Sequence, residues 1–117
     1  MTRVLLDTHA LMWWIDEPAK VPDAWQQIAL APENDVYVSS VAAWEIETKK
    51  RIGKLRFDHV VDEVVARFEF EPLSVSMLHA TLAGQLGWDH RDPFDRMLVA
   101  QAISDDMILL TSDVAIR

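Results

Sequence analysis

RVLLDTHALMWWI, residues 3–15, changes its hydrophobic period at one residue. Val4, Leu5 and Leu6 form a short continuous apolar run that ends at Asp7, as expected for a buried strand. After Asp7 the apolar residues from Leu11 to Ile15 recur at helical spacing. This segment therefore predicts a buried strand, an acid at the end of the strand, and a helix.

The same alternation continues along the chain. Further strands are predicted at 35–39, 72–75 and 107–111, and helices at 8–15, 22–30, 40–51, 58–68, 76–87 and 93–104. Ser40, Asp58 and Ser76 have the side chains of helix N-caps, and Trp14 and Trp44 are predicted to pack in the core. Near-continuous apolar strands between helices favour a parallel sheet covered on both faces. We expect one α/β domain over residues 1–117, a three-layer sandwich with a central parallel sheet.

Length, composition and charge exclude several classes of protein. A chain of 117 residues with 50% hydrophobic residues is too apolar to be disordered, and it is the size of one domain. It has no cysteine, which excludes disulfide scaffolds, cysteine zinc sites and thiol nucleophiles and is compatible with the cytoplasm. The formal net charge of −8 argues against general binding of nucleic acid through bulk charge. Six residues follow the last predicted strand, so we expect a closing strand or tail to be missing from this sequence.

Acidic residues follow the predicted strands at one edge of the sheet. Asp7 ends the first strand, and Asp113 follows the last. Asp92 and Asp95 flank the start of the helix before that strand, and Glu45 lies early in the helix after the second strand. Each acid alone could be a helix cap, a first-turn acid or a turn residue. Because ligands bind at the carboxyl ends of parallel strands, together they predict a site.

Clustered carboxylates need cations or protons to balance their charge. Two of them about 4 Å apart repel by roughly 4 kcal/mol at an effective dielectric constant of about 20. Oxygen ligands without cysteine favour Mg²⁺ or Mn²⁺ over zinc. Such ions suit phosphodiester hydrolysis, in which activated water attacks in line and the leaving oxygen is stabilised. The metals would also let an acidic protein approach a polyanion.

Four motifs resemble those of the PIN-domain family, and more narrowly of VapC-type toxins of toxin–antitoxin systems. They occur in order over nearly the whole chain: Val4-Leu5-Leu6-Asp7-Thr8-His9, residues 39–45, His90-Arg91-Asp92-Pro93-Phe94-Asp95-Arg96 with Ala100 and Ala102, and Leu110-Thr111-Ser112-Asp113. The resemblance implies a Mg²⁺-dependent or Mn²⁺-dependent endoribonuclease. It also implies a cognate antitoxin, a homodimer and a cytoplasmic location.

The resemblance also implies roles for individual residues. It makes Asp7, Glu45, Asp95 and Asp113 the acidic quartet that is catalytic and binds metal. Asp92 is an additional acid that could assist the metal ligands, and Thr111 or Ser112 matches the small polar position beside the last acid. His9 departs from the family, many members of which have asparagine there, and it is expected to orient Asp7 or contact RNA.

Basic residues cluster after Glu45. Lys49, Lys50, Arg51, Lys54 and Arg56 are 5 of the 11 lysines and arginines. This cluster is either a solvated helix end favoured by the helix dipole or a rim that binds RNA phosphates. Arg96, next to Asp95, is expected either to pair with an acid or to contact phosphate.

Three other functions compete with the nuclease. A phosphatase with a nucleophilic aspartate would usually have a second aspartate at position 9, where this chain has His9. A phosphoacceptor receiver domain would have a lysine after a late strand, where this chain has Asp113. Clustered like charge argues against a non-catalytic PIN-like binding module, because such a module has no need for it. This binding module and a metal-dependent phosphatase stay open as alternatives.

Overall fold

The computed structural model describes residues 2–87 and 92–112. Within them, four parallel strands form one sheet in the order β3-β2-β1-β4. The strands are β1 (Arg3–Leu6), β2 (Asp35–Ser39), β3 (Glu71–Leu73) and β4 (Ile108–Leu110). The helices are α1 (Thr8–Asp16), η1 (Pro18–Lys20, a 3₁₀ turn), α2 (Asp23–Leu30), α3 (Ser40–Arg51), α4 (Val61–Arg67), α5 (Met77–Gln85) and α6 (Pro93–Ser104).

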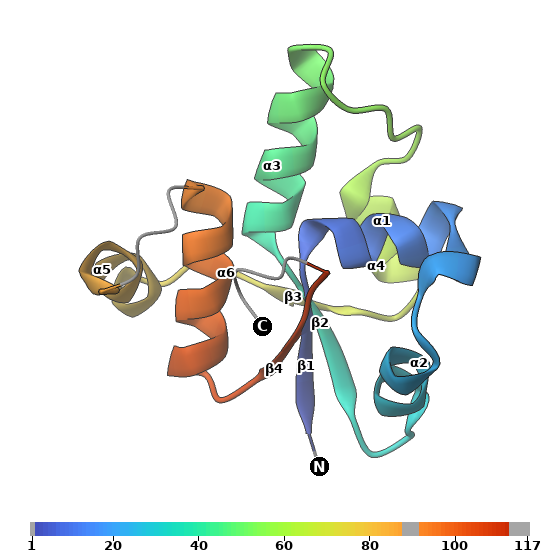
Figure 1. The fold of residues 1–117 in the computed structure, drawn as a ribbon, viewed down its shortest axis with the longest axis horizontal. Coiled ribbons are helices and arrows are strands. Elements are labelled where there is room, and N and C mark those ends of the chain that lie inside the picture. The colour runs from blue at the N-terminus through green and yellow to red at the C-terminus, as the bar shows by residue number, and fades with distance from the viewer. Residues whose placement is uncertain (1, 88–91, 113–117) are drawn as a thin grey trace.

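Two hydrophobic cores cover the two faces of the sheet. On one face Val4, Leu6 and Val38 pack with residues of α1, α3 and α4. On the other face Leu5 packs with Leu98 and other residues of α6. Alternate residues of β1 therefore enter opposite cores, as the pleat of a strand requires. Figure 1 shows the resulting layers, with α5 and α6 on one side of the sheet and α1, α2 and α4 on the other. The predicted three-layer α/β sandwich is confirmed.

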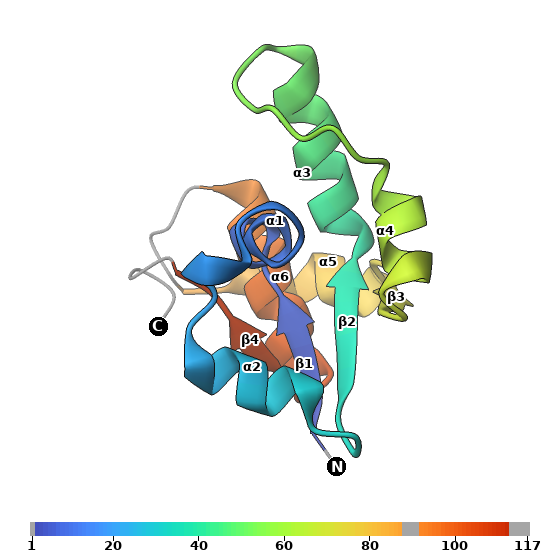
Figure 2. The same ribbon diagram turned by 90° about the vertical axis from the view of Figure 1, so that its right-hand side faces the viewer.

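The parallel sheet sets the position of the site. All four strands have their carboxyl ends at the same edge, and α1 and α3 begin there directly after β1 and β2. Figures 1 and 2 show α3 rising beyond this edge. No helix within the described residues combines the length and the apolar character that a bilayer span requires.

Three details of the elements differ from the predictions. The N-cap of α3 is Ser39, whose hydroxyl accepts a hydrogen bond from the Val41 amide, so the predicted cap Ser40 is the first helical residue. Helix α4 begins after Val60 without a side-chain cap, and Asp58 instead forms an exposed ion pair with Arg56. The third strand begins and ends earlier than predicted, at Glu71–Leu73.

Trp44 does not pack in the core, because 60% of it is exposed. It makes an edge-to-face contact with Phe94, with the ring centroids 4.7 Å apart. The residue preceding Glu45 thus lies on the outer side of α3, over the first turn of α6.

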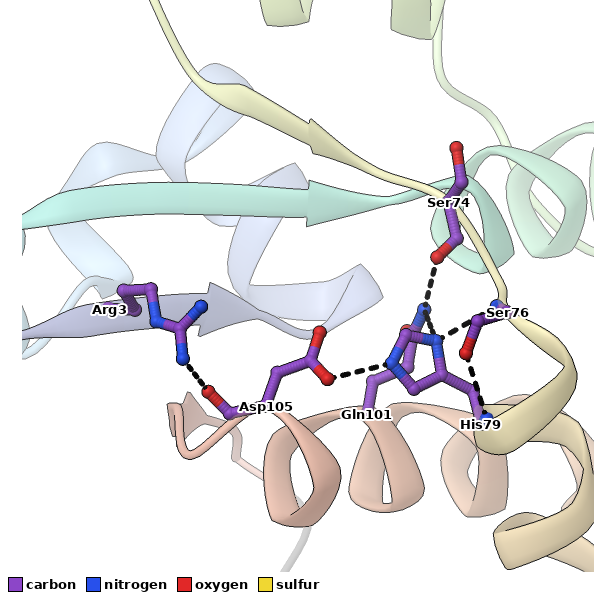
Figure 3. A network of polar contacts seen from close by, with 6 residues as sticks. All are labelled: Arg3, Ser74, Ser76, His79, Gln101 and Asp105. Carbon is purple, nitrogen blue, oxygen red and sulfur yellow. Dashed lines mark hydrogen bonds and ion pairs between the residues drawn. The ribbon is translucent and has the colours of Figure 1, made fainter.

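A partly buried polar network joins α5 to α6 (Figure 3). His79 Nδ1 accepts a hydrogen bond from the Ser76 amide, and the Ser76 hydroxyl accepts one from the His79 amide, so the predicted cap Ser76 is confirmed. His79 Nε2 lies 3.0 Å from Asp105 Oδ1 beyond the end of α6. The Arg3 guanidinium donates to the Asp105 carbonyl. The network lies at the end of α6 far from its N-terminus and fixes α6 against α5 and β1.

Candidate functional site

Asp7 is held at the carboxyl edge of the sheet by its backbone and its side chain. Its amide donates a hydrogen bond of 3.1 Å to the Leu110 carbonyl, so the β1–β4 pairing continues into the site. Its Oδ1 accepts a hydrogen bond of 2.7 Å from the Ala10 amide and caps α1. The capping role that an isolated aspartate would have is thus real here. It also orients the other carboxylate oxygen.

The environment of Asp7 disfavours its charge. Burial raises the pKa of the Asp7 carboxyl above its usual value. Hydrogen bonds from the Thr111 hydroxyl and the Ala10 amide, and the charge of His9, oppose that rise in pKa. The negative charge of Glu45 adds to the rise in pKa, because the two carboxylates are near enough for their charges to repel. A cation near Asp7 would therefore stabilise its ionised form.

Glu45 comes from α3, and both of its carboxylate oxygens have partners. The residue is only 3% exposed. Its Oε1 accepts a hydrogen bond from the hydroxyl of Thr8, in the first turn of α1. Its Oε2 accepts one from the ammonium of Lys49, one turn later on α3. Glu45 is thus a buried carboxylate that is already held in place and neutralised.

Asp92 and Asp95 lie at the start of α6. Asp92 is its N-cap, and its Oδ1 accepts hydrogen bonds from the amides of Phe94 at 2.9 Å and Asp95 at 3.3 Å. Pro93 occupies the first helical position, where its missing N–H and fixed φ angle favour a helix start. Asp95 is the first-turn acid of the helix. Both side chains therefore project from the start of α6.

These acids line one pocket. It has a volume of about 340 Å³. Its lining residues are Asp7, Thr8, His9, Glu45, Lys49, Asp92, Asp95 and Ser112. Three members of the predicted quartet, the additional acid Asp92 and two of the auxiliary residues, His9 and Ser112, thus lie together. The fourth member, Asp113, lies outside the described residues, and Thr111 contributes through its hydrogen bond to Asp7.

The pocket has the kind of side chains that bind a hard divalent cation, but their present spacing is not that of a metal site. Its acids offer only carboxylate oxygens, the ligands preferred by Mg²⁺ and Mn²⁺. Among residues 2–87 and 92–112, no three acidic or histidine side chains are placed together as a metal site. The Lys49 ammonium donates a hydrogen bond to Glu45 and supplies a positive charge where a metal ion would otherwise do so. The residues would fit a metal ion if Glu45 released Lys49 and bound the ion instead.

Lys49 and Thr8 are the two residues of the site whose roles the sequence analysis missed. The hydrogen bond to Glu45 raises the pKa of Lys49, burial opposes the rise, and the charges of Glu45, Asp92 and Asp95 add to it. Its Nζ lies 5.9 Å from the centre of the Phe94 ring. Lys49 thus lines the pocket, and its contact with RNA phosphates stays a prediction. The sequence did hold a signal, because glutamate and lysine four residues apart face each other on a helix.

The other basic residues lie outside the pocket lining. Lys50 pairs with the exposed Glu47 at 3.4 Å, and Arg51 and Lys54 are exposed. The Arg96 guanidinium donates to the carbonyls of Ala83 and Leu86 at 2.8 and 2.9 Å, which ties α6 to the end of α5. This placement favours a structural role for Arg96. RNA contacts by Lys50 and Arg51 stay predictions.

A family model and a known protein both match all or nearly all of the chain. The family model described as PIN domain matches residues 4–117. The chain is 30% identical to Ribonuclease VapC22 of Mycobacterium tuberculosis, over all of this chain and 92% of that protein.

Solved structures share the fold. VapBC2 from Rickettsia felis, bound to a DNA fragment from their promoter, has a TM-score of 0.69 at 18% identity, over 97% of this chain and 89% of that chain. FitAcB from Neisseria gonorrhoeae has a TM-score of 0.59 at 21% identity, with the same coverages.

Proposed function

The chain belongs to the PIN-domain family, and on that premise we propose that it is an endoribonuclease, the toxin component of a toxin–antitoxin system. A cognate antitoxin holds it in check. The single domain of residues 1–117 acts in the cytoplasm on RNA and pairs with a second copy of itself. The relatedness to Ribonuclease VapC22 over the whole chain supports the reaction type.

The observation that carries the proposal is the convergence of acids from three elements on one pocket. Asp7 comes from the end of β1, Glu45 from α3, and Asp92 and Asp95 from the start of α6. We propose that Asp7, Glu45, Asp95 and Asp113 hold Mg²⁺ or Mn²⁺, with Asp92 assisting. When bound, such an ion supplies Lewis acidity to water and to a phosphate oxygen.

The surrounding residues prepare the acids for this task. The Ala10 amide and the Thr111 hydroxyl fix the Asp7 carboxylate, and Thr8 fixes that of Glu45. Asp7 and Glu45 thus have defined orientations before substrate arrives, which reduces the reorganisation needed during the reaction. His9 is exposed and lines the pocket, so it is placed to contact RNA.

The surface around the pocket favours RNA over a small phosphate ester. The exposed Trp44 ring rests against Phe94 at the start of α6 and offers a face on which a nucleobase can stack. Lys50 and Arg51 follow on the same helix and can reach phosphates. Weaker, less salt-dependent RNA binding after their joint replacement by alanine would support this rim, and unchanged binding would exclude it.

Cleavage of RNA by the purified, antitoxin-free chain tests the proposal. A mixed RNA panel is incubated with Mg²⁺, with Mn²⁺ and with EDTA. We expect metal-dependent cleavage, reduced at least about 100-fold in Asp7→Asn and Asp95→Asn, because each removes a carboxylate from the pocket. The matched control is Glu47→Gln, which changes an exposed acid of α3 outside the pocket and should cleave normally.

The possible outcomes separate the competing functions. Cleavage that persists in EDTA or in Asp7→Asn would contradict the proposed site. Hydrolysis of small phosphate esters but of no RNA would favour a phosphatase. Absence of both activities, together with absence of metal binding, would favour a non-catalytic binding module.

A further inference from the structure

Lys49 occupies an unusual position for a lysine near a helix end. Its ammonium donates to Glu45 Oε2 inside the pocket and lies 5.9 Å from the centre of the Phe94 ring. The Lys49 side chain is 31% exposed, whereas that of Glu45 is 4% exposed. The positive charge thus lies between a buried carboxylate and an aromatic face and is partly exposed.

The neighbouring ion pair on the same helix shows the contrast. Lys50 and Glu47 are 3.4 Å apart, and the Glu47 side chain is 63% exposed. Such a surface pair contributes little to stability, because water solvates both partners. Removing one partner of a buried pair is more costly, because the other charge is then left without compensation. Lys49 and Lys50 thus form a matched pair for comparison.

Lys49 and a divalent cation would compete for the same carboxylate. Glu45 Oε1 already accepts from Thr8, and Oε2 accepts from Lys49. A cation that binds Oε2 would lie within a few ångströms of the ammonium, and the two positive charges would repel each other. Asp92 and Asp95 line the same pocket, so the ammonium also balances part of their charge while no metal is bound.

We propose that Lys49 is a built-in counter-ion of Glu45, which offsets the charge of Glu45 without metal and which a divalent cation must displace in order to bind. This inference rests on the proposed function, because it takes the pocket to be the metal site of the nuclease. Lys49 is a positioning residue, and it raises the metal concentration at which the site fills. The long lysine side chain allows the displacement, because its ammonium can move into solvent while the helix stays in place.

Metal affinity and stability of the same variants test the inference. Lys49→Met and Lys50→Met are compared with the wild-type chain by calorimetric titration with Mn²⁺ and by thermal unfolding in EDTA. Lys49→Met should bind Mn²⁺ about tenfold more tightly, since a competing charge is gone. It should also unfold a few degrees lower in EDTA, since Glu45 loses its partner. Lys50→Met should match the wild type in both measurements.

A second variant guards against a folding defect. Lys49→Gln keeps a hydrogen-bond donor for Glu45 but removes the charge, so it too should bind Mn²⁺ more tightly. Equal or weaker Mn²⁺ binding by both Lys49 variants would overturn the inference. If the wild type cleaves RNA and binds Mn²⁺ while the Lys49 variants bind it equally, the inference alone fails. If the wild type neither binds Mn²⁺ nor cleaves RNA, the proposed function fails as well.

Discussion

Asp7 combines a structural and a chemical role in one side chain. Its Oδ1 caps α1 through the Ala10 amide, while the residue lines the pocket and is 4% exposed. Burial raises the pKa of its carboxyl, and the charge of Glu45 adds to the rise. A group with a raised folded-state pKa favours folding while it is protonated. That contribution is lost as the pH rises through the folded-state pKa, so the ionised form of Asp7 opposes folding above that pKa.

Asp7→Asn should therefore stabilise the metal-free protein while abolishing its activity. Asparagine keeps an oxygen for the Ala10 amide and is a good N-cap, but it has no charge to bury. We expect a gain of about 1 kcal/mol, which is a rise of a few degrees in Tm in EDTA. Thermal unfolding in EDTA at pH 7 measures this, with Asp23→Asn at the exposed start of α2 as the control. A lower Tm for Asp7→Asn would show that its charge stabilises the fold.

At the scale of residues, the sequence located acids better than it located their partners. Asp7, Glu45, Asp92 and Asp95 could be predicted because strand ends and helix starts were visible in the pattern. Thr8 was missed as a partner of Glu45, because a contact between α1 and α3 depends on how the helices pack. Lys49 was missed although its spacing of four residues from Glu45 on α3 was visible in the sequence. Trp44 was wrongly placed in the core, since an apolar residue beside a buried one on a helix can face either way.

Among the elements, helix α6 begins at the candidate site and ends at a polar network. Asp92 caps its first turn, and Asp105 follows its last turn. Because His79 Nδ1 accepts from the Ser76 amide, its proton lies on Nε2 and is donated to Asp105 (Figure 3). This hydrogen bond is the main cause that lowers the pKa of Asp105. The network thus holds the helix that positions Asp92 and Asp95.

The network gives a pH dependence whose sign is fixed. A carboxyl with a lowered folded-state pKa contributes stability above its unfolded value of 3.8, and loses it as the pH falls through the folded-state pKa. Asp105→Asn should cost about 1 kcal/mol at pH 7 and flatten the loss of stability below about pH 4. Urea unfolding at several pH values measures both effects, with the exposed Asp58→Asn as the control. A wild-type acid profile in Asp105→Asn would contradict this account.

The type and order of the elements could be predicted, whereas their ends required tertiary information. Continuous apolar runs identified β1, β2 and β4, and helical spacing identified the helices between them. Ser39 and Ser40 are both good caps, and the choice between them depends on where β2 stops pairing with β3, at Ser39 opposite Leu73. Asp58 is not a cap, because the chain buries Phe57 and begins α4 only after Val60.

At the scale of the whole molecule, the strand order explains the site. The order β3-β2-β1-β4 places β1 between β2 and β4, so the residue after β1 lies near the elements that follow both neighbours. Helix α3 follows β2, and residues 111 and 112 follow β4. The sequence predicts parallel strands and one acidic edge, but the strand order emerges only from the fold. Four of the 19 acidic residues line the pocket at this edge.

The proposed metal site is tested most directly by an anomalous-scattering map of crystals grown with Mn²⁺. We expect a peak in the pocket, within coordination distance of Asp7, Glu45 and Asp95, with the Lys49 ammonium moved away from Glu45. Crystals of Asp7→Asn should show no peak at this position. A peak elsewhere, or none in the pocket of a protein that cleaves RNA with Mn²⁺, would contradict the claim that these acids form the nuclease site.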